Sequence, residues 1–353
     1  MTDTRLAAEG IEVALDRGLG HLSSFAVLRD GRRIDPFARV EWADEPPDSP
    51  RFPPDMAPHL GRMSKDFLCA PFSTDDVEDA PAHGWPANSA WRVVEAEGAR
   101  ATFALDRRVA GAEIEKDWTL IDGHPFLYQR HRFRGGEGRI PVAHHTMVDL
   151  SRGGEILLSP KRLYETPGER PEAGRDDTRS IFAYPAEAVD PTRFPGADGP
   201  LDLTRWPVGD RHNDFAMAVE ADLSGWGWAM VVRPADGDAA ILIKRAAVLP
   251  QTMLWFSNGG RQFPPWNGGF SGVLGLEEAA SLGGEGWRAS AAANRWTGRG
   301  VPTALQLVPG GVAEVGFALG AIPWDGPPAP VRVLDDRVEV GDVTLPFRAD
   351  LVA

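Results

Sequence analysis

Short strand-like segments dominate the chain, and no apolar period of 3.6 residues persists beyond two or three turns. The segments are apolar or alternate between apolar and polar residues, and they end at Gly, Pro, Asp or Asn, which is typical of strands. Two segments split by an Asp-Asp pair, 331–334 and 337–340, indicate a hairpin. The clearest single strands are expected at 90–95, 101–105, 113–121, 126–133, 215–220, 228–232, 239–242 and 312–319. The pattern predicts an all-β protein.

Two stretches differ in composition from the rest, 45–58 and 166–200, and both are rich in Pro and Asp. Either could link two domains. Strand-like segments of the same character lie on both sides of each, and β-sandwiches often exceed the average domain size. We therefore interpret both stretches as loops and expect a single domain over 1–353.

The charge and cysteine content exclude several classes of partner. The chain has 51 acidic and 37 basic residues, a formal charge of −14, which would repel nucleic acid. It contains no run of about 18 apolar residues that would cross a membrane, and its first residues do not form a secretory signal. The single cysteine, Cys69, allows no internal disulfide. We expect a cytoplasmic protein that binds neither nucleic acid nor membrane.

Two histidine-containing segments are candidates for a site. His83 and Gly84 lie in a Pro-bounded turn, where a backbone without a Cβ lets a ligand approach the imidazole. His144 and His145 lie on an expected strand, so they point to opposite faces and only one can face a given groove. Taken alone, each is read more simply as an exposed turn histidine or as a strand histidine bound by the backbone.

A third candidate is a pair of acids. Glu277 and Glu278 follow the apolar segment 273–276, close to Trp255 and Trp266. A carboxyl group at the end of a buried strand would have a raised pKa and could act as a base near neutral pH. The alternative is an ordinary acidic strand end. Because the two acids face opposite ways, at most one belongs to a site.

The order of these segments resembles that of the galactose mutarotase-like family, the aldose 1-epimerases, over nearly the whole chain. Segment 66–73 (DFLCAPFS) is similar to a family segment that ends in Pro-Phe, and the His-Gly pair follows at a similar distance. Segments 145–150 (HTMVDL) and 275–277 (GLE) resemble the family's histidine and glutamate segments. The resemblance selects His145 and Glu277, and it implies one large antiparallel β-sandwich, the family's supersandwich.

The resemblance also implies a reaction, the interconversion of the α and β anomers of a sugar. Glu277 would be the general base on the C1 hydroxyl, His145 the acid toward the ring oxygen, and His83 would bind the ring or a neighbouring hydroxyl. Neither a metal nor any other cofactor is implied. The partner would be a monosaccharide or a sugar phosphate, and the protein a monomer or homodimer with a role in carbohydrate metabolism.

Further sugar-binding residues are expected from the comparison with the family pattern. The family's Asn-Arg after Pro-Phe is replaced here by 73–76 (STDD), so its sugar contact is absent or comes from another residue such as Arg62. The resemblance also implies that Asp214 would take the place of an aspartate that binds sugar hydroxyls in the family. Trp85 and Trp266, with Trp255, are the aromatic residues expected to pack against a sugar ring.

Three alternatives remain open at this point. The departures favour, as a second hypothesis, a non-catalytic carbohydrate-binding protein on the same fold. A metal site could draw on His83, the 144–145 pair and Glu277, although neighbouring strand histidines do not easily converge on one ion. A lyase or hydrolase of a sugar polymer is the third. A phosphate group, if present, could be bound by basic residues drawn from Arg62, Lys244, Arg245 and Arg261.

Overall fold

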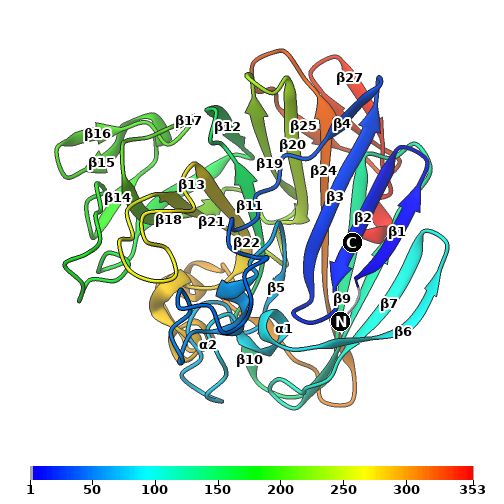
Figure 1. The fold of residues 1–353 in the computed structure, drawn as a ribbon, viewed down its shortest axis with the longest axis horizontal. Helices are drawn as coiled ribbons and strands as arrows, with labels where there is room; N and C mark the ends of the chain where they lie inside the picture. The colour runs from blue at the N-terminus through cyan, green and yellow to red at the C-terminus, as the bar shows by residue number, and fades with distance from the viewer. Residues whose placement is uncertain (1–2, 353) are drawn as a thin grey trace.

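The computed structural model describes residues 3–352 and consists mainly of two large sheets with short connecting helices (Figure 1). The seven-stranded sheet has the order β14-β13-β18-β21-β22-β11-β5, and the nine-stranded sheet the order β17-β12-β19-β20-β24-β9-β8-β7-β6. Neighbouring strands within both are antiparallel. The seven strands are β14 Ala186–Ala188, β13 Lys161–Thr166, β18 His212–Glu220, β21 Gln251–Asn258, β22 Val273–Ala280, β11 Val142–Asp149 and β5 Leu68–Cys69. The nine are β17 Arg205–Trp206, β12 Gly154–Leu158, β19 Trp226–Arg233, β20 Asp238–Arg245, β24 Val312–Pro323, β9 Phe126–Gly135, β8 Ala112–Thr119, β7 Arg100–Leu105 and β6 Trp91–Glu97.

Smaller elements cover the edges and faces of these sheets. In Figure 1, β1–β4 lie on the right and the β15–β16 hairpin on the far left. The small strands are β1 Thr4–Ala8, β2 Ile11–Asp16, β3 His21–Arg29, β4 Arg32–Ile34, β10 Arg139–Ile140, β15 Phe194–Gly196, β16 Gly199–Leu201, β23 Leu305–Gln306, β25 Val331–Val333, β26 Arg337–Val340 and β27 Val343–Pro346. The helices are α1 Gly84–Asn88, α2 Trp287–Ala291 and the 3₁₀ turns η1 Pro58–Gly61, η2 Pro191–Arg193, η3 Gly283–Glu285, η4 Thr297–Arg299 and η5 Ala349–Leu351.

The central strands of the seven-stranded sheet are buried on both faces. On β22, Leu274 and Leu276 belong to the core between the two large sheets, whereas Val273 and Ala279 belong to a second apolar cluster on the outer face. This division follows from the two-residue period of a strand. Because both faces are covered, β11, β21 and β22 are almost entirely buried, and polar side chains on them need partners inside the protein.

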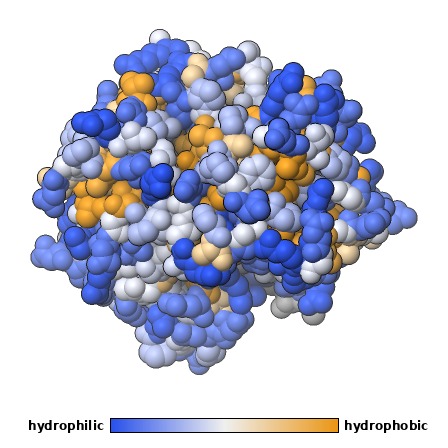
Figure 2. All heavy atoms as spheres, turned by 90° about the horizontal axis from the view of Figure 1, so that it is seen from above, coloured by the Kyte–Doolittle hydropathy of each residue, from blue (hydrophilic) through white to orange (hydrophobic). Residues whose placement is uncertain are grey.

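The surface shows the opposite composition. On the face drawn in Figure 2, hydrophobic residues reach the surface only in separate patches among hydrophilic ones. Within residues 3–352 the structure contains no helix with the length and apolar character needed to cross a membrane.

The predicted all-β fold is confirmed, and one boundary is corrected. The hairpin predicted at 331–340 is formed by β25 and β26. The 166–200 segment, which was expected to be a loop, contributes a strand to the seven-stranded sheet, because β14 pairs with β13. Glu277 and Glu278 were expected after a strand ending at 276, but β22 continues to Ala280. The strand tolerates both acids because each has a buried partner, described below.

Candidate active site

A cavity of about 1170 Å³ opens over the outer face of the seven-stranded sheet. Its lining includes His145 from β11, Trp255 from β21 and Glu277 from β22. The end of β13 and loops from distant parts of the chain complete it, among them 167–175 and 261–266. The cavity therefore combines rigid strands, which fix side-chain positions, with long connections that shape the opening.

His145 and Glu277 form a direct pair at this cavity. They are register partners on adjacent antiparallel strands, and the His145 Nε2 lies 3.0 Å from the Glu277 Oε1. Both side chains are almost completely buried. Glu277 Oε2 and His145 Nδ1 have no hydrogen-bond partner among residues 3–352. One carboxylate oxygen of Glu277 is thus buried with its hydrogen-bonding capacity unused by the protein.

Burial disfavours the charged form of each partner. Desolvation raises the pKa of Glu277 from its usual 4.5 to about 8, and the charge of Arg261 opposes this rise. Desolvation also lowers the pKa of His145 to about 3. At pH values between about 3 and about 8 the pair holds one proton. Because the two groups interact, the observed pKa values describe the pair and not either residue alone. An acid and a base are therefore available together near neutral pH.

Neighbouring groups fix the pair in place. The His145 ring stacks on Phe67 with 4.6 Å between centroids, and the edge of Trp255 approaches it at 5.7 Å. Gly275 leaves room for the acid, since a Cβ at this position would lie 2.9 Å from Glu277 Oε1 and 3.0 Å from Trp255 Cβ. The geometry of the pair thus depends on a residue that has no side chain.

The turn that carries His83 brings it to the same cavity. His83 has φ +65° and directly precedes α1, and its ring lies 5.1 Å from that of His145. Gly84 has φ +73°, and a Cβ there would lie 2.0 Å from the Ala70 carbonyl oxygen. Only glycine fits this close contact. The His-Gly sequence is therefore needed to bring the imidazole against β5.

The sequence pattern does not indicate two of the cavity residues. It offers Arg261 only as one member of a phosphate cluster, yet its guanidinium lies over Trp266 at 4.4 Å and pairs with Glu172 at 2.7 Å. His59, in η1, also lines the cavity and contacts the His83 ring edge-on at 5.1 Å. Both lie in loop segments without a strand period, so no alternation pattern pointed to them.

Other expected site residues lie outside the cavity lining. Arg62 pairs with Asp16 at 3.0 Å, and Trp85 stacks under Arg107 at 4.1 Å. Asp214 is fully buried on β18 and accepts hydrogen bonds from Ser180, the Tyr184 hydroxyl and two backbone amides. It lies one residue before Phe215, which lines the cavity, so the strand period turns Asp214 toward the core between the sheets. Of the expected aromatic residues, Trp255 and Trp266 line the cavity.

The second member of each adjacent pair faces the other way. His144 stacks on Phe317 at 4.2 Å and contacts Asp66 at 3.2 Å in the core between the sheets. Glu278 is paired with Lys244 of the nine-stranded sheet and accepts a hydrogen bond from Thr252 at 2.7 Å. The prediction that only one residue of each pair faces a given groove is confirmed. Lys244 is held in this buried network, away from the cavity.

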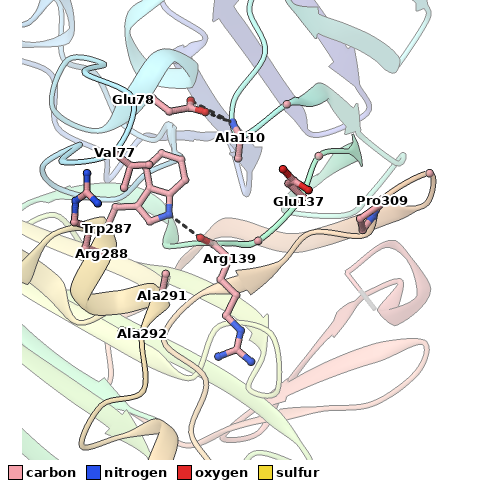
Figure 3. Close-up of a pocket in the computed structure, with 14 residues that line it drawn as sticks. Val77, Glu78, Ala110, Glu137, Arg139, Trp287, Arg288, Ala291, Ala292 and Pro309 are labelled. Atoms are coloured by element: carbon pink, nitrogen blue, oxygen red, sulfur yellow. Dashed lines mark hydrogen bonds between the residues drawn. The ribbon is translucent and has the colours of Figure 1, made fainter.

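A second cavity of about 930 Å³ lies between α2 and the loops before β10 (Figure 3). There the Trp287 indole donates to the Arg139 carbonyl oxygen at 2.6 Å, and the Glu78 carboxylate accepts from the Ala110 amide at 3.0 Å. The side chains that line it include Glu137 but no histidine. Across residues 3–352, no cluster of three or more His, Cys, Asp or Glu is placed to hold a metal ion. We therefore place the candidate active site at the His145–Glu277 cavity.

Comparison with solved structures identifies proteins that share this fold. No protein-family model and no curated protein sequence matches the chain. A candidate aldose 1-epimerase from Escherichia coli K12 is similar over 91% of this chain and 99% of its own, with 13% identity and a TM-score of 0.60. A galactose mutarotase related enzyme from Lactobacillus acidophilus is similar over 92% of this chain and 99% of its own, with 12% identity and a TM-score of 0.58. A galactose mutarotase-like protein from Lactobacillus casei is similar over 91% of this chain and 99% of its own, with 12% identity and a TM-score of 0.52. The chain therefore has the fold of the galactose mutarotase-like proteins.

Proposed function

We propose that the protein is a cofactor-independent aldose 1-epimerase that interconverts the α and β anomers of a monosaccharide. The observation that carries the proposal is the buried His145–Glu277 pair, with 3.0 Å between Nε2 and Oε1 in a cavity of about 1170 Å³. Opening a sugar ring moves protons at two oxygens bonded to the same carbon. An acid and a base that serve both oxygens must lie close to the same carbon, and these two side chains lie close together.

The pair balances the reaction with a single proton. Burial places the pair's one proton on Glu277 and leaves His145 neutral, so this proton first crosses the 3.0 Å contact to His145 Nε2. The resulting carboxylate takes the proton of the C1 hydroxyl while the bond from C1 to the ring oxygen breaks. The electron pair leaves with the ring oxygen, which takes the proton of His145, and C1 becomes an aldehyde. Rotation about the C1–C2 bond and attack of the hydroxyl on the other carbonyl face reverse both transfers. Each transfer contributes about a hundred- to ten-thousandfold.

The surrounding residues suit a sugar ligand. Trp266 and Trp255 supply aromatic surface against which the C–H face of a pyranose packs. Arg261 lies beside both rings, 5.1 Å from Trp255 and 4.4 Å from Trp266, and its charge favours the ionised form of Glu277 that acts as base. His83 at the same wall is a further hydrogen-bonding group for ring or hydroxyl oxygens.

Anomer exchange measured by saturation-transfer NMR tests the proposal. A panel of aldoses that includes glucose and galactose is compared with wild type, Glu277→Gln and His145→Ala. We expect wild type to accelerate exchange for at least one aldose, and each variant to lose at least about a hundredfold of that acceleration. Sugar binding with exchange rates equal to the uncatalysed rate in all three proteins would instead identify a non-catalytic carbohydrate-binding protein.

A further inference from the structure

The ring of His59 has one defined proton position. Asn88 Oδ1 accepts a hydrogen bond from the His59 backbone amide at 2.9 Å, and Asn88 Nδ2 donates to the carbonyl oxygens of Ala82 and Gly84 at 2.9 and 2.7 Å. These backbone partners fix which side-chain atom of Asn88 is the oxygen. Since that oxygen also lies 3.1 Å from His59 Nδ1, the ring proton is on Nδ1. The other nitrogen, Nε2, is then a hydrogen-bond acceptor.

His83 has the opposite arrangement. The Ser73 backbone amide approaches His83 Nδ1 at 3.4 Å, and Cys69 Sγ lies 3.3 Å from the same nitrogen. A backbone amide can only donate, so Nδ1 is the acceptor and the ring proton is on Nε2. His83 therefore presents a donor at Nε2, whereas His59 presents an acceptor.

Both histidines line the cavity that holds the His145–Glu277 pair. The two rings line it and meet edge to face, with 5.1 Å between centroids and an angle of 89°. Neither Nε2 has a protein partner within residues 3–352, and neither is among the fully buried polar atoms. Desolvation lowers the pKa of His59 to about 4 and that of His83 well below its usual value, so both rings are neutral at pH 7.

We propose that His59 and His83 form a hydroxyl-binding pair that makes the cavity selective for a neutral sugar over a phosphorylated or oxidised one. A hydroxyl both donates and accepts, so it satisfies His59 and His83 together. A phosphate or carboxylate only accepts, and its oxygen would face the His59 lone pair. Four arginines line the cavity, and carboxylates neutralise three of them: Arg261 pairs with Glu172, Arg295 with Glu165 and Arg175 with Asp177. The fourth, Arg170, donates to Thr178 and to the Arg175 carbonyl oxygen. The inference rests on the proposed sugar ligand but not on turnover.

Binding is measured with the Glu277→Gln protein, so that turnover is not required. Calorimetry uses neutral aldoses, including glucose, galactose and xylose, with glucose 6-phosphate, galactose 6-phosphate and the corresponding uronates. We expect neutral sugars to bind more tightly than the charged ones. Addition of His59→Phe should weaken neutral sugar binding roughly tenfold, and His59→Gln, which restores an acceptor, should recover most of it. His21→Phe is the matched control, since His21 is buried and stacks on Phe67 but does not line the cavity.

Nitrogen-15 NMR of the histidine rings provides a readout that a purely structural role would not change. His59 should carry its proton on Nδ1 and His83 on Nε2, and a neutral sugar should shift the His59 Nε2 resonance. The opposite proton position on either ring, tighter binding of charged sugars, no binding of any neutral sugar, or unchanged affinity in folded His59→Phe would overturn the inference. Anomer exchange by wild type together with a reversed proton position, tighter binding of charged sugars or unchanged affinity in His59→Phe would leave the proposed function standing.

Discussion

His145 and Glu277 lie opposite each other on β11 and β22, and their side chains meet at 3.0 Å on the cavity side of the sheet. Both are buried, and the burial shifts their pKa values in opposite directions. An acid held protonated and an imidazole held neutral are unfavourable for folding and useful for proton transfer. Several predictions about stability and activity depend on this one contact.

Replacing Glu277 by Gln should make the protein more stable at alkaline pH. Burial raises the pKa of Glu277 to about 8, so the folded protein keeps a proton that the unfolded chain has lost above its usual value of 4.5. Wild-type stability should therefore fall as the pH rises through this range. The advantage of Glu277→Gln in urea unfolding should grow between pH 5 and 8.5, by an amount on the order of 2–4 kcal/mol. A constant difference across this range would contradict the raised pKa.

The rate of anomer exchange should fall above about pH 8, where the pair loses its single proton. Arg261→Met should move this alkaline limb to higher pH, because the arginine charge lowers the pKa of Glu277. The measurement is kcat/KM against pH. Arg295→Met, which removes a cation bound to Glu165 and Glu285 instead, serves as the control. An alkaline limb that stays in place in Arg261→Met would argue against this electrostatic link.

Gly275→Ala should impair activity strongly and should also lower stability, because the new Cβ would lie 3.0 Å from Trp255 Cβ in a buried strand. The new Cβ would lie 2.9 Å from Glu277 Oε1, so the carboxylate has to move away from His145. A displacement of this kind costs about a hundredfold in rate, and exchange kinetics with thermal unfolding would measure both effects. Gly298→Ala is the matched control, because a Cβ there meets nothing within 4 Å. Full activity in Gly275→Ala would show that the observed carboxylate position is not required.

Lys244→Met should destabilise the fold strongly without touching the cavity. Lys244 bridges the two sheets by pairing with Glu278 and with Glu220, all three being buried. Removing the cation leaves the buried Glu278 carboxylate without a compensating charge, whereas Glu220 keeps Lys161, and this loss costs about 3–5 kcal/mol. Arg245→Met, on the same strand, removes only a contact with Trp226 and should cost about 1 kcal/mol or less. Chemical unfolding of both variants gives the comparison, and equal losses would refute the role assigned to the bridge.

The sequence predicted the features that depend on local strand geometry. The alternation along β11 and β22 correctly required that His144 and His145, and likewise Glu277 and Glu278, face opposite sides. Alternation also places Asp214 and Phe215 on opposite faces of β18. Which of the two faces carries the cavity follows only from the order of the strands in the sheet. Strand alternation is local, whereas its phase depends on distant partners.

The loop contributions to the site could not be predicted in this way. Arg261 reaches Trp266 and Glu172 because two distant loops fold over the same sheet face. His59 becomes a cavity residue through Asn88, 29 positions away. Neither contact leaves a periodic signal in the sequence, since both depend on long-range packing.

A crystal structure of the Glu277→Gln protein with a bound neutral aldose tests the central claim most directly. The account predicts a sugar in the cavity, with the C1 hydroxyl within hydrogen-bond distance of the residue at 277 and the ring oxygen within hydrogen-bond distance of His145 Nε2. A sugar bound with C1 turned away from both side chains, or bound at another place on the protein, would contradict it.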